Sequence, residues 1–467
     1  MLKIVEALNS LVTRYPSLAA PLAEFAAIVE EVVDPADMAL AEARVLEATD
    51  ALACAGLTEA LGAHASDAAV VEVDGLRYRR LRDPSPGTYF GLRGPVTVKR
   101  HLYRQVGVRN GPTIVPLELS AGLVDGLWTP LAAAAAGHLV QSEPSRDAVQ
   151  TCRALHVMPY SRSSLERAGD LLGERWESIR CEAEDELMRG FIVPEEATTL
   201  SVSVDRVSLP MEEAALDERG AVVVDADGKE QVRVAHRMAY CGVWTLHDAE
   251  GAPLHSVRYG RMPAEGHGPI EESLWGDIEA LTLAKPTLRL IGLADGAPEM
   301  QHLLDRTVGV FDGAEVAIDF WHVVEKVADA VKATGRNTVQ WLPRFRDWLL
   351  TKEPGAEHVL LVLRTWEAQG QGPTPEALSD AITYLDRNAH RMRYKRLRDR
   401  GLPIGSGHVE ATCKTLVSTR MKRSGARWKP PGGQAILSLR SLAKSSRWDD
   451  AMAIMLPTWR GEIRAAA

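Results

Sequence analysis

Three acidic residues stand far apart in the sequence, each at a position where a carboxylate can do chemistry. Asp205 and Asp295 each follow a short β-type run, and Glu410 follows a Gly-Ser-Gly turn at 405–407. Carboxylate oxygens suit hard divalent cations such as Mg²⁺ or Mn²⁺, and two such ions can stabilise the attacking and leaving oxygens of a phosphoryl transfer. Asp205, Asp295 and Glu410 therefore predict a catalytic site that holds two metal ions, provided that the fold brings them together.

Each acid has a structural alternative when it is taken alone. An aspartate after a strand is often a turn former or a helix cap, and the helix dipole favours a glutamate in a first turn. Asp319 ends another predicted strand and is the rival of Asp295 as second metal ligand. His322 lies three residues after Asp319. It could position other groups of the site, or it could be a structural residue bonded to Asp319.

A basic segment surrounds the third acid. Residues 387–429 hold 13 Lys or Arg and two acids, a balance of +11 in a chain of net charge −9. This asymmetry indicates a localised anion-binding surface on an acidic protein, and DNA is the expected partner. The expected DNA-binding residues are Arg391, Arg393, Lys395, Arg396, Arg398, Lys414, Arg420, Lys422, Arg423, Arg427 and Trp428. A salt bridge to Glu410 is the alternative for Lys414, and burial in a core is the alternative for Trp428.

The surrounding sequence predicts a mixed α/β fold. Strands are expected over residues 198–209, 221–225, 231–246 and 253–263, followed by helix, strand, helix, strand and helix through residue 334. Hairpin strands followed by α-β-α-β predict a mixed sheet covered by helices. Period-two alternation places Ser201, Ser203 and Asp205 on one face of the first strand. Because chemistry in α/β sheets collects at the carboxyl ends of parallel strands, Asp205 and Asp295 can lie close together there.

The expected domain organisation has six parts. They are 1–65, helical; 66–125, a small β domain; 126–195, helical with a helix-turn-helix-like DNA-binding unit; 196–335, the first part of the α/β core; 336–400, an all-helical insertion; and 401–467, the C-terminal helices of the core with Glu410. The helix-turn-helix prediction rests on a helix at 146–154 and a second one that opens at 161–164, with simple bundle packing as the alternative. In the β domain, Asp74-Gly75 and Asn110-Gly111 predict tight turns.

Composition excludes several classes of protein. With 467 residues, 46% apolar and 25% charged, the chain is long enough for several domains and has the composition of a globular protein. It contains no run of about 18 apolar residues and no signal peptide, so a cytoplasmic location is expected. The five cysteines include no C-x-x-C pair, which argues against a disulfide framework and a four-cysteine zinc site.

These features together resemble a bacterial insertion-sequence transposase of the DDE class, with an RNase H-like catalytic core. The segments that carry the resemblance are SVSVDRV (201–207), IGLADGAPEM (291–300), AIDFWHVVEKV (317–327) and above all GLPIGSGHVEATCKTLVSTRMKRSGARW (401–428). The resemblance spans residues 90–450 and implies Asp205, Asp295 and Glu410 as first, second and third acids. It also implies an insertion domain at 336–400. Asp319-Phe-Trp-His322 resembles the D-x-x-H signature of mutator-like and hAT-like branches.

The sequence departs from this family in two places. Many relatives carry a cysteine-rich zinc ribbon in the N-terminal β region, whereas residues 66–120 contain no cysteine. The first acid is followed by Arg206 rather than by a small residue. Turns and packing must therefore hold the β domain together, and Arg206 must find a place beside the first acid.

The resemblance also implies an activity. It is the metal-dependent cleavage of DNA at the ends of a mobile element, followed by strand transfer, with two Mg²⁺ or Mn²⁺ ions and a homo-oligomer of two or more chains. The expected location is the bacterial cytoplasm, at the nucleoid when the protein acts. Two other functions stay open: a non-catalytic DNA-binding regulator derived from a transposase, and an RNase H-like nuclease without strand transfer.

Overall fold

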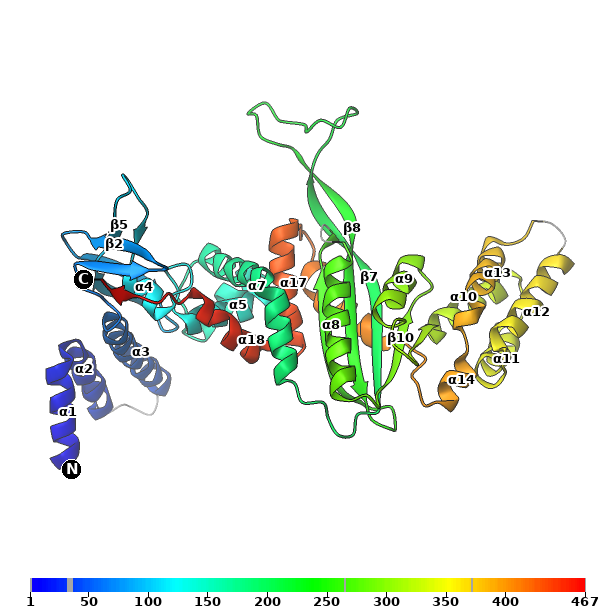
Figure 1. Cartoon of the computed structure of the whole chain (residues 1–467), viewed down its shortest axis with the longest axis horizontal. Helices are drawn as coiled ribbons and strands as arrows, with labels where there is room; N and C mark the ends of the chain where they lie inside the picture. Colours follow the sequence, from blue (N-terminus) through cyan, green and yellow to red (C-terminus); the bar gives the residue numbers. More distant parts are fainter. Residues whose placement is uncertain (1, 32–36, 264–265, 371–372, 467) are drawn as a thin grey trace. The chain divides into compact units, whose positions relative to one another are not determined.

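The structure is a computed structural model that describes residues 2–31, 37–263, 266–370 and 373–466. The chain is mixed α/β, as the sequence predicts, and divides into two compact units (Figure 1). The first unit contains residues 1–178 together with 449–467, and the second contains residues 179–448. Within the described ranges, no helix is long and apolar enough to cross a membrane.

The first unit combines helices with two small antiparallel sheets. Its elements are α1 (Leu2–Arg14), α2 (Ala19–Glu30), α3 (Met38–Gly62), β1 (Val70–Val73), β2 (Leu76–Arg80), β3 (Ser85–Phe90), β4 (Pro95–Arg100), β5 (Tyr103–Gln105), β6 (Thr113–Ile114), α4 (Pro116–Ala121), α5 (Pro130–Ser142), α6 (Ser145–Ala154), α7 (Arg162–Gly190, which continues into the second unit), α18 (Trp448–Met455) and β12 (Arg464–Ala465). The larger sheet has the strand order β12-β1-β2-β5-β6. Asp74 and Gly75 have φ values of 51° and 76°, as a two-residue hairpin turn requires.

Aromatic and β-branched side chains hold the larger sheet together. Val71, Val73, Tyr78 and Tyr103 form its buried cluster. The hydroxyl of Tyr103 donates a hydrogen bond to the carbonyl of Ala68 at 2.8 Å, which ties β5 to the chain that precedes β1. The β domain contains no cysteine, and packing and hydrogen bonds hold its strands together.

Helices α6 and α7 lie where the sequence predicts the two helices of a helix-turn-helix. The turn between them packs against β3, because the rings of Phe90 and Tyr160 stack with centroids 4.2 Å apart. The Tyr160 hydroxyl also donates to the carbonyl of Gly91 at 2.6 Å. The turn is thus fixed to the β domain, and the DNA-binding role of the helix pair stays a prediction.

The second unit is built around one five-stranded sheet. Its elements are β7 (Thr199–Ala214), β8 (Val232–His247), β9 (Pro253–Arg261), α8 (Gly268–Ala284), β10 (Arg289–Ala294), α9 (Pro298–Thr307), β11 (Glu315–Ile318), α10 (Phe320–Ala333), α11 (Thr338–Thr351), α12 (Gly355–Gln369), α13 (Glu376–Asn388), α14 (Tyr394–Asp399), α15 (Gly407–Thr412), a π-type turn (Cys413–Ser418), α16 (Thr419–Met421) and α17 (Pro430–Lys444). The strand order is β11-β10-β7-β8-β9. Strands β7, β8 and β9 are antiparallel, while β7, β10 and β11 are parallel.

This topology confirms the predicted mixed sheet of hairpin strands followed by α-β-α-β. Leu200, Val202 and Val204 of β7 pack with side chains of α8 and α9 on one face of the sheet. Helices α15 and α17 cover the other face, where Val409 and Leu437 join a second buried cluster. The period-two alternation therefore separates the apolar face of β7 from the face that carries Asp205.

Strand β7 is longer than predicted. The sequence predicts a strand over residues 198–209, but β7 continues to Ala214 and pairs with β8 along its whole length. Residues 207–239 extend beyond the sheet as a hairpin, called the arm from here on (Figure 1). The predicted strand at 221–225 was wrong, because this part of the arm forms only the single bridges Leu216–Val222 and Val224–Glu230.

The predicted insertion at 336–400 contains helices and no strand in its described part. Helices α10 to α14 share one buried cluster with the strands β10 and β11. Phe345, Leu363 and Leu385 are among its fully buried members. The insertion therefore packs against the edge of the sheet that follows Asp295 and does not form a separate lobe.

Candidate active site

Asp205, Asp295 and Asp319 occupy one row across three neighbouring parallel strands: Asp295 and Asp319 follow the ends of β10 and β11, and Asp205 lies within β7, two residues beyond the last residue paired with β10. The pairing of β10 with β7 ends at Leu293, opposite Ser203. Continued by two residues, this register places Asp295 beside Asp205. Asp319 follows the last paired residue of β11. This edge is where functional groups of an open α/β sheet converge.

Asp205 is half-buried, and among the described residues no Lys or Arg forms an ion pair with it. Its Oδ1 accepts a hydrogen bond from the backbone N–H of Arg206 at 2.6 Å, and its Oδ2 lies 3.6 Å from Sγ of Cys413. Burial raises the pKa of Asp205, and the negative charge of Asp295 raises it further. An ionised carboxylate here is costly, and a divalent cation would offset that cost.

The residue after the first acid is accommodated by partners of its own. The guanidinium of Arg206 forms an ion pair with Glu299 of α9. The hydroxyl of Tyr240 donates to the other oxygen of Glu299 at 2.6 Å. Since successive side chains of a strand point to opposite faces, Arg206 is directed away from Asp205 and does not neutralise it.

Asp295 ends β10 and begins a tight turn. Its Oδ1 accepts a hydrogen bond from the backbone N–H of Ala297 at 3.2 Å. The ring of Tyr384, from α13, lies against Gly296 so closely that a Cβ added there would come within 2.3 Å of it. Burial raises the pKa of Tyr384, and the negative charge of Asp295 raises it further. Tyr384 therefore walls the site on the side of the helical insertion.

Asp319 is fully buried and has both oxygens occupied. Its Oδ1 accepts from the backbone N–H of His322 at 2.9 Å, which caps α10, and its Oδ2 accepts from the backbone N–H of Ser406. Asp319 thus ties the start of α10 to the turn that precedes Glu410. This geometry favours Asp295 over Asp319 as the second metal ligand.

Glu410 approaches the aspartates through His322. Its Oε1 lies 3.7 Å from Nε2 of His322, and His322 in turn interacts electrostatically with Asp205. No ion pair joins Glu410 to Lys414 in the part of the chain that the structure describes. The carboxylate is 56% exposed, so it can reorient without leaving a core.

The helix that carries Glu410 contains a π-type turn, a feature frequent at functional sites. Arg440 of α17 is buried behind this turn, and its Nε donates to the carbonyl of Leu416 at 2.7 Å. Burial lowers the pKa of Arg440 to about 10, with the charges of Arg420 and Arg423 acting in the same direction. Arg440 therefore stays charged at neutral pH and satisfies backbone oxygens of the wide turn.

The donor set fits a divalent cation in its chemistry. Asp205 and Asp295 offer hard oxygen ligands, and burial raises the pKa of Asp205, with the charge of Asp295 raising it further and that of His322 lowering it. In the described ranges, however, no three His, Cys, Asp or Glu side chains lie close enough together to form a metal site as they stand. Glu410 must turn from His322 toward Asp205 to complete one.

Four of the predicted DNA-binding residues are instead engaged inside the protein. Arg391 forms two hydrogen bonds of 2.8 Å with Asp305, and Arg393 lies 3.4 Å from Glu353 and 2.8 Å from Glu357. The remaining ion pairs are Lys395 with Asp399 and Arg396 with Glu315. These four side chains have carboxylate partners in the folded chain, and a DNA-tracking role for 391–398 stays a prediction. Arg398 is exposed.

Residues 414–428 divide into buried and exposed members. Arg420 is 8% exposed and lies over the ring of Trp428, with its Cζ 5.1 Å from the centroid. Trp428 packs against a buried cluster and donates its Nε1–H to Met421 O at 2.9 Å. The packing of Trp428 matches the alternative of burial in a core, and DNA contact by Arg420 and Trp428 stays a prediction. The exposed basic residues of the segment are Lys414, Lys422, Arg423 and Arg427.

Sequence reasoning missed several residues of this site. Cys413, Tyr384 and Arg440 contact the acids or their helix, but they come from positions that no local pattern links to Asp205 or Asp295. Trp321 is 51% exposed beside His322 and lies within 3.4 Å of a Cβ added at Gly405. Its place in the Asp-Phe-Trp-His motif was the one signal available in the sequence.

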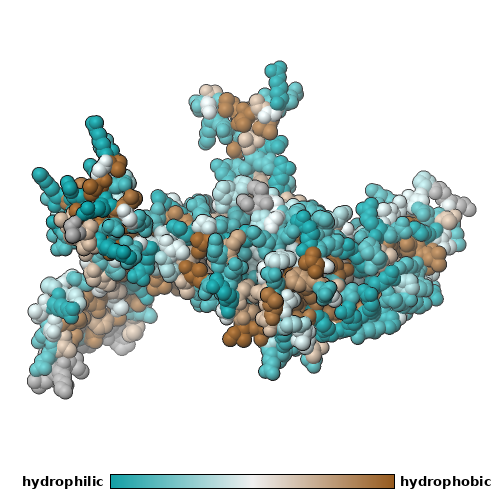
Figure 2. All heavy atoms as spheres, viewed as in Figure 1, coloured by the Kyte–Doolittle hydropathy of each residue, from teal (hydrophilic) through white to brown (hydrophobic). Residues whose placement is uncertain are grey.

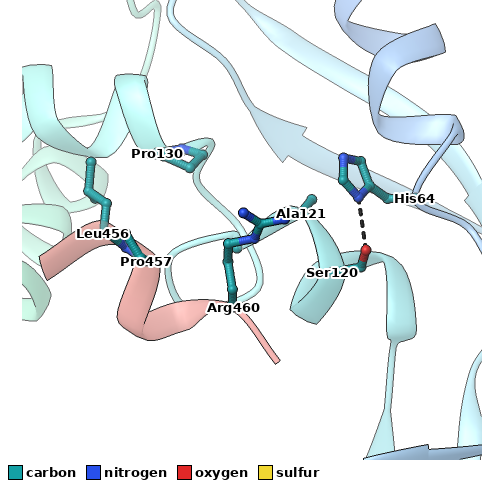
Figure 3. A pocket seen from close by; sticks show the side chains of 8 residues that line it. His64, Ser120, Ala121, Pro130, Leu456, Pro457 and Arg460 are labelled. Carbon is teal, nitrogen blue, oxygen red and sulfur yellow. Dashed lines mark hydrogen bonds between the residues drawn. The ribbon is translucent and has the colours of Figure 1, made fainter. Parts of the chain in front are cut away.

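A separate pocket lies in the first unit. Its lining residues are His64, Ser120, Ala121, Gly122, Pro130, Leu456, Pro457 and Arg460 (Figure 3). Nδ1 of His64 is 2.9 Å from the hydroxyl of Ser120, and Arg460 extends along the opening. None of the three acids lies in it, and its wall provides no carboxylate for metal binding.

Comparisons with known proteins found one weak structural similarity and no match in sequence. No family model matches the chain, and no curated protein matches it. Among solved structures, the chain is similar to the Drosophila P element transposase strand transfer complex, with 11% sequence identity, 68% of this chain and 80% of that chain covered, and a TM-score of 0.24. Similarity at this level assigns neither a family nor a fold.

Proposed function

We propose that this chain is a DDE-type transposase with an RNase H-like catalytic core, in which Asp205, Asp295 and Glu410 are the three acids. The observation that carries the proposal is the meeting of Asp205 and Asp295 at the carboxyl edge of one sheet, with Glu410 brought to them through His322. The sheet order, with three antiparallel strands followed by two parallel ones, supports it.

Asp205 and Asp295 would hold the metal ions, and Glu410 would complete their ligation. Bound Mg²⁺ or Mn²⁺ would supply electrostatic stabilisation for a phosphoryl transfer. Cys413 keeps its proton, because its hydrogen bond with Cys241 and its burial raise its pKa. It therefore faces Asp205 as a neutral thiol and leaves the carboxylate able to bind a cation. His322 holds Glu410 in reach of the aspartates.

The exposed basic residues after Glu410 would hold the DNA. Lys414, Lys422 and Arg427 follow the third acid on the same segment, so a phosphodiester backbone bound by them passes close to the acids. The reaction begins with hydrolysis of a phosphodiester at the element end, which leaves a 3′-hydroxyl. That hydroxyl then attacks a phosphodiester of target DNA and displaces its 3′ oxygen. Such a reaction joins two ends, so an assembly of two or more chains in the bacterial cytoplasm belongs to the proposal.

The test is a cleavage and joining assay with purified protein, Mn²⁺ and labelled DNA that carries the ends flanking the coding region. Cleaved ends followed by joined products are expected. Asp205→Asn, Asp295→Asn and Glu410→Gln should each abolish both products while the circular dichroism spectrum stays unchanged. Cutting without joining would identify a nuclease, and binding without cutting would identify a regulator.

Glu325→Gln is the matched control for Glu410→Gln. Glu325 lies 3.9 Å from Nδ1 of His322, on the other side of the same ring, and it is exposed. If loss of any negative charge beside His322 stopped the reaction, both variants would be inactive. The proposal requires that Glu325→Gln retains activity, and equal loss in the two variants would remove Glu410 from the metal site.

A further inference from the structure

The pocket of the first unit is a hollow in which apolar side chains and polar groups meet (Figure 3). Four segments that are far apart in the sequence form it: the residues after α3, the end of α4, the start of α5 and the turn after α18. Its volume of about 360 Å³ lies in the range of pockets that hold small molecules. The exposed apolar side chains at the end of the arm, brown in Figure 2, lie in the second unit and take no part in it.

Arg460 is fixed at the opening of this pocket. Its backbone N–H donates to Pro457 O at 2.9 Å, and the N–H of Gly461 donates to Leu119 O at 3.1 Å. The stem of the Arg460 side chain packs on Gly122, where an added Cβ would come within 2.6 Å of the arginine Cγ. Gly122 has a φ of 67°, which glycine adopts without strain. The guanidinium is therefore carried by a stem that the surrounding backbone positions.

The charge of Arg460 is left without a carboxylate. In the part of the chain that the structure describes, no Asp or Glu forms an ion pair with its guanidinium, whereas Arg464 pairs with Glu462 at 2.9 Å. The described lining of the pocket contains no acid either. A guanidinium offers five N–H donors in a planar fork that matches a carboxylate or a phosphate. An anion is therefore the group that would use both the charge and the donors.

His64 and Ser120 add a further donor to the pocket. Nδ1 of His64 lies 2.9 Å from Oγ of Ser120. In one tautomer the hydroxyl donates to Nδ1, and Nε2–H of the neutral imidazole is left as a donor. In the other, Nδ1–H donates to the hydroxyl oxygen, and the hydroxyl hydrogen is left. Either arrangement leaves one donor of the pair for a ligand, and neither brings a negative charge.

The rest of the lining is apolar. Ala121, Pro130, Leu456 and Pro457 provide it, and in the view of Figure 3 Arg460 lies between Pro130 and the imidazole–hydroxyl pair. Apolar walls favour a ligand that carries an apolar or aromatic group, because its burial removes that surface from water. A DNA backbone offers phosphates without such a group. The lining therefore fits a small molecule better than it fits DNA.

We propose that this pocket binds a small organic anion, in which one phosphate or carboxylate group is joined to an apolar or aromatic body. The anionic group lies against the guanidinium of Arg460 and accepts a hydrogen bond from the His64–Ser120 pair. The body packs against Pro130 and Leu456. This binding site needs neither the three acids nor DNA, so it goes beyond the proposed function.

Titration calorimetry of the full chain with phenyl phosphate and with benzoate tests the site and distinguishes the two anionic groups. At least one of the two probes should bind at one site per chain with a Kd of about 1 mM or below. Inorganic phosphate, which lacks the body, and benzyl alcohol, which lacks the charge, should each bind about tenfold or more weakly. Equal binding of either control, or no binding of both probes, would overturn the proposal.

Two variants locate the binding. Arg460→Gln removes the charge, and Ala121→Leu fills the hollow while keeping Arg460, so each should weaken binding of the better probe about tenfold or more. Arg464→Gln is the matched control, because it changes an exposed arginine that already pairs with Glu462, and its Kd should equal that of the wild type. Circular dichroism verifies that each variant is folded.

The outcomes separate the pocket from simple attraction to surface charge. Unchanged binding in Arg460→Gln or in folded Ala121→Leu, or equal loss in the two arginine variants, would contradict the proposal. Binding of duplex DNA that depends on Arg460, with neither probe bound, would make this arginine a DNA contact and would also contradict it. The titrations contain no divalent metal and measure no cleavage, so they stand whether or not the chain cuts DNA.

Discussion

Asp205 of β7 and Asp295 after β10 differ from Asp319 after β11, although the three aspartates lie in the same row. Asp319 is fully buried and uses both oxygens to cap α10 and to hold the turn before Glu410. Asp205 and Asp295 are less buried and accept hydrogen bonds from neighbouring backbone N–H groups and from the thiol of Cys413, and among the described residues neither forms an ion pair with a Lys or Arg. One carboxylate therefore serves the structure, and the other two are left with unused coordination capacity.

The two basic segments show the same contrast. Arg391, Arg393 and Arg396 direct their charge to carboxylates of the second unit. Lys414, Lys422 and Arg427 remain exposed next to Glu410. In both comparisons, the groups assigned to function are those whose hydrogen-bonding or charge needs the folded chain leaves open. Four predictions test that division.

The largest effect is expected at the two open aspartates. Asp205→Asn and Asp295→Asn should each lower the rate of DNA cleavage about 1000-fold or more, since metal ligation supplies several kcal/mol to phosphoryl transfer. The measurement is the single-turnover cleavage rate in Mn²⁺. The urea midpoint of unfolding should not fall in either variant. Retained activity in Asp295→Asn would contradict the assignment of Asp295, rather than Asp319, as the second metal ligand.

Asp319 should behave in the opposite way. Asp319→Ala removes the cap of α10 and leaves the buried N–H of Ser406 without its acceptor, so the free energy of unfolding should drop by about 3 kcal/mol. Urea unfolding followed by tryptophan fluorescence measures this decrease. Asp319→Asn keeps one acceptor oxygen and should be destabilised less. If Asp319→Ala were as stable as the wild type but inactive, Asp319 would be a ligand rather than a structural residue.

The basic segments should separate in the salt dependence of DNA binding. Replacing Lys414, Lys422 and Arg427 by Ala should reduce the slope of log K against log [salt] by about 0.9 for each DNA phosphate that the variant no longer neutralises. Replacing Arg391, Arg393 and Arg396 by Ala should leave that slope unchanged and lower stability instead, because their carboxylate partners would be left without counter-charges. Fluorescence anisotropy at several salt concentrations checks both variants. A reversed result would restore 391–398 as the DNA-binding segment.

Sequence patterns go far where the deciding interactions are local. The alternation through Val204 predicts which face of β7 carries Asp205, and the order of strands and helices predicts the mixed sheet. The ion pair of Arg391 could not be predicted in the same way, because its partner Asp305 lies 86 positions away. The hydrogen bond from Ser406 N–H to Asp319 could not be predicted either, because the two residues come together only in the folded chain.

The arm shows a different limit. The sequence predicts a strand through Leu209, whereas the strand continues past Met211 to Ala214. The strand continues because β8 supplies a partner for every residue to Ala214. Strand length in a hairpin is set by the partner strand, and such pairing cannot be read from one of the two strands alone.

The smallest expected effect concerns the charge of Asp205 itself. Burial and Asp295 raise its pKa in the folded state, so the folded protein keeps this proton to higher pH than the unfolded chain, whose aspartates titrate near pH 3.9. The stability that the proton supplies is complete below about pH 3.9 and is lost as the pH rises through the folded pKa. At pH 7 the ionised carboxylate therefore costs stability. Asp205→Asn should unfold about 2 °C above the wild type there.

Two further measurements test whether the charge of Asp205 causes this small change in unfolding temperature. The difference between Asp205→Asn and the wild type should shrink toward pH 4, where the wild-type carboxyl regains its proton, and differential scanning fluorimetry across pH measures it. Mg²⁺ or Mn²⁺ should raise the unfolding temperature of the wild type at pH 7, because a cation offsets the same cost, but should leave Asp205→Asn almost unchanged. A variant that is less stable than the wild type at pH 7 would mean that Asp205, like Asp319, is satisfied by the fold, and the contrast between the strand ends would disappear.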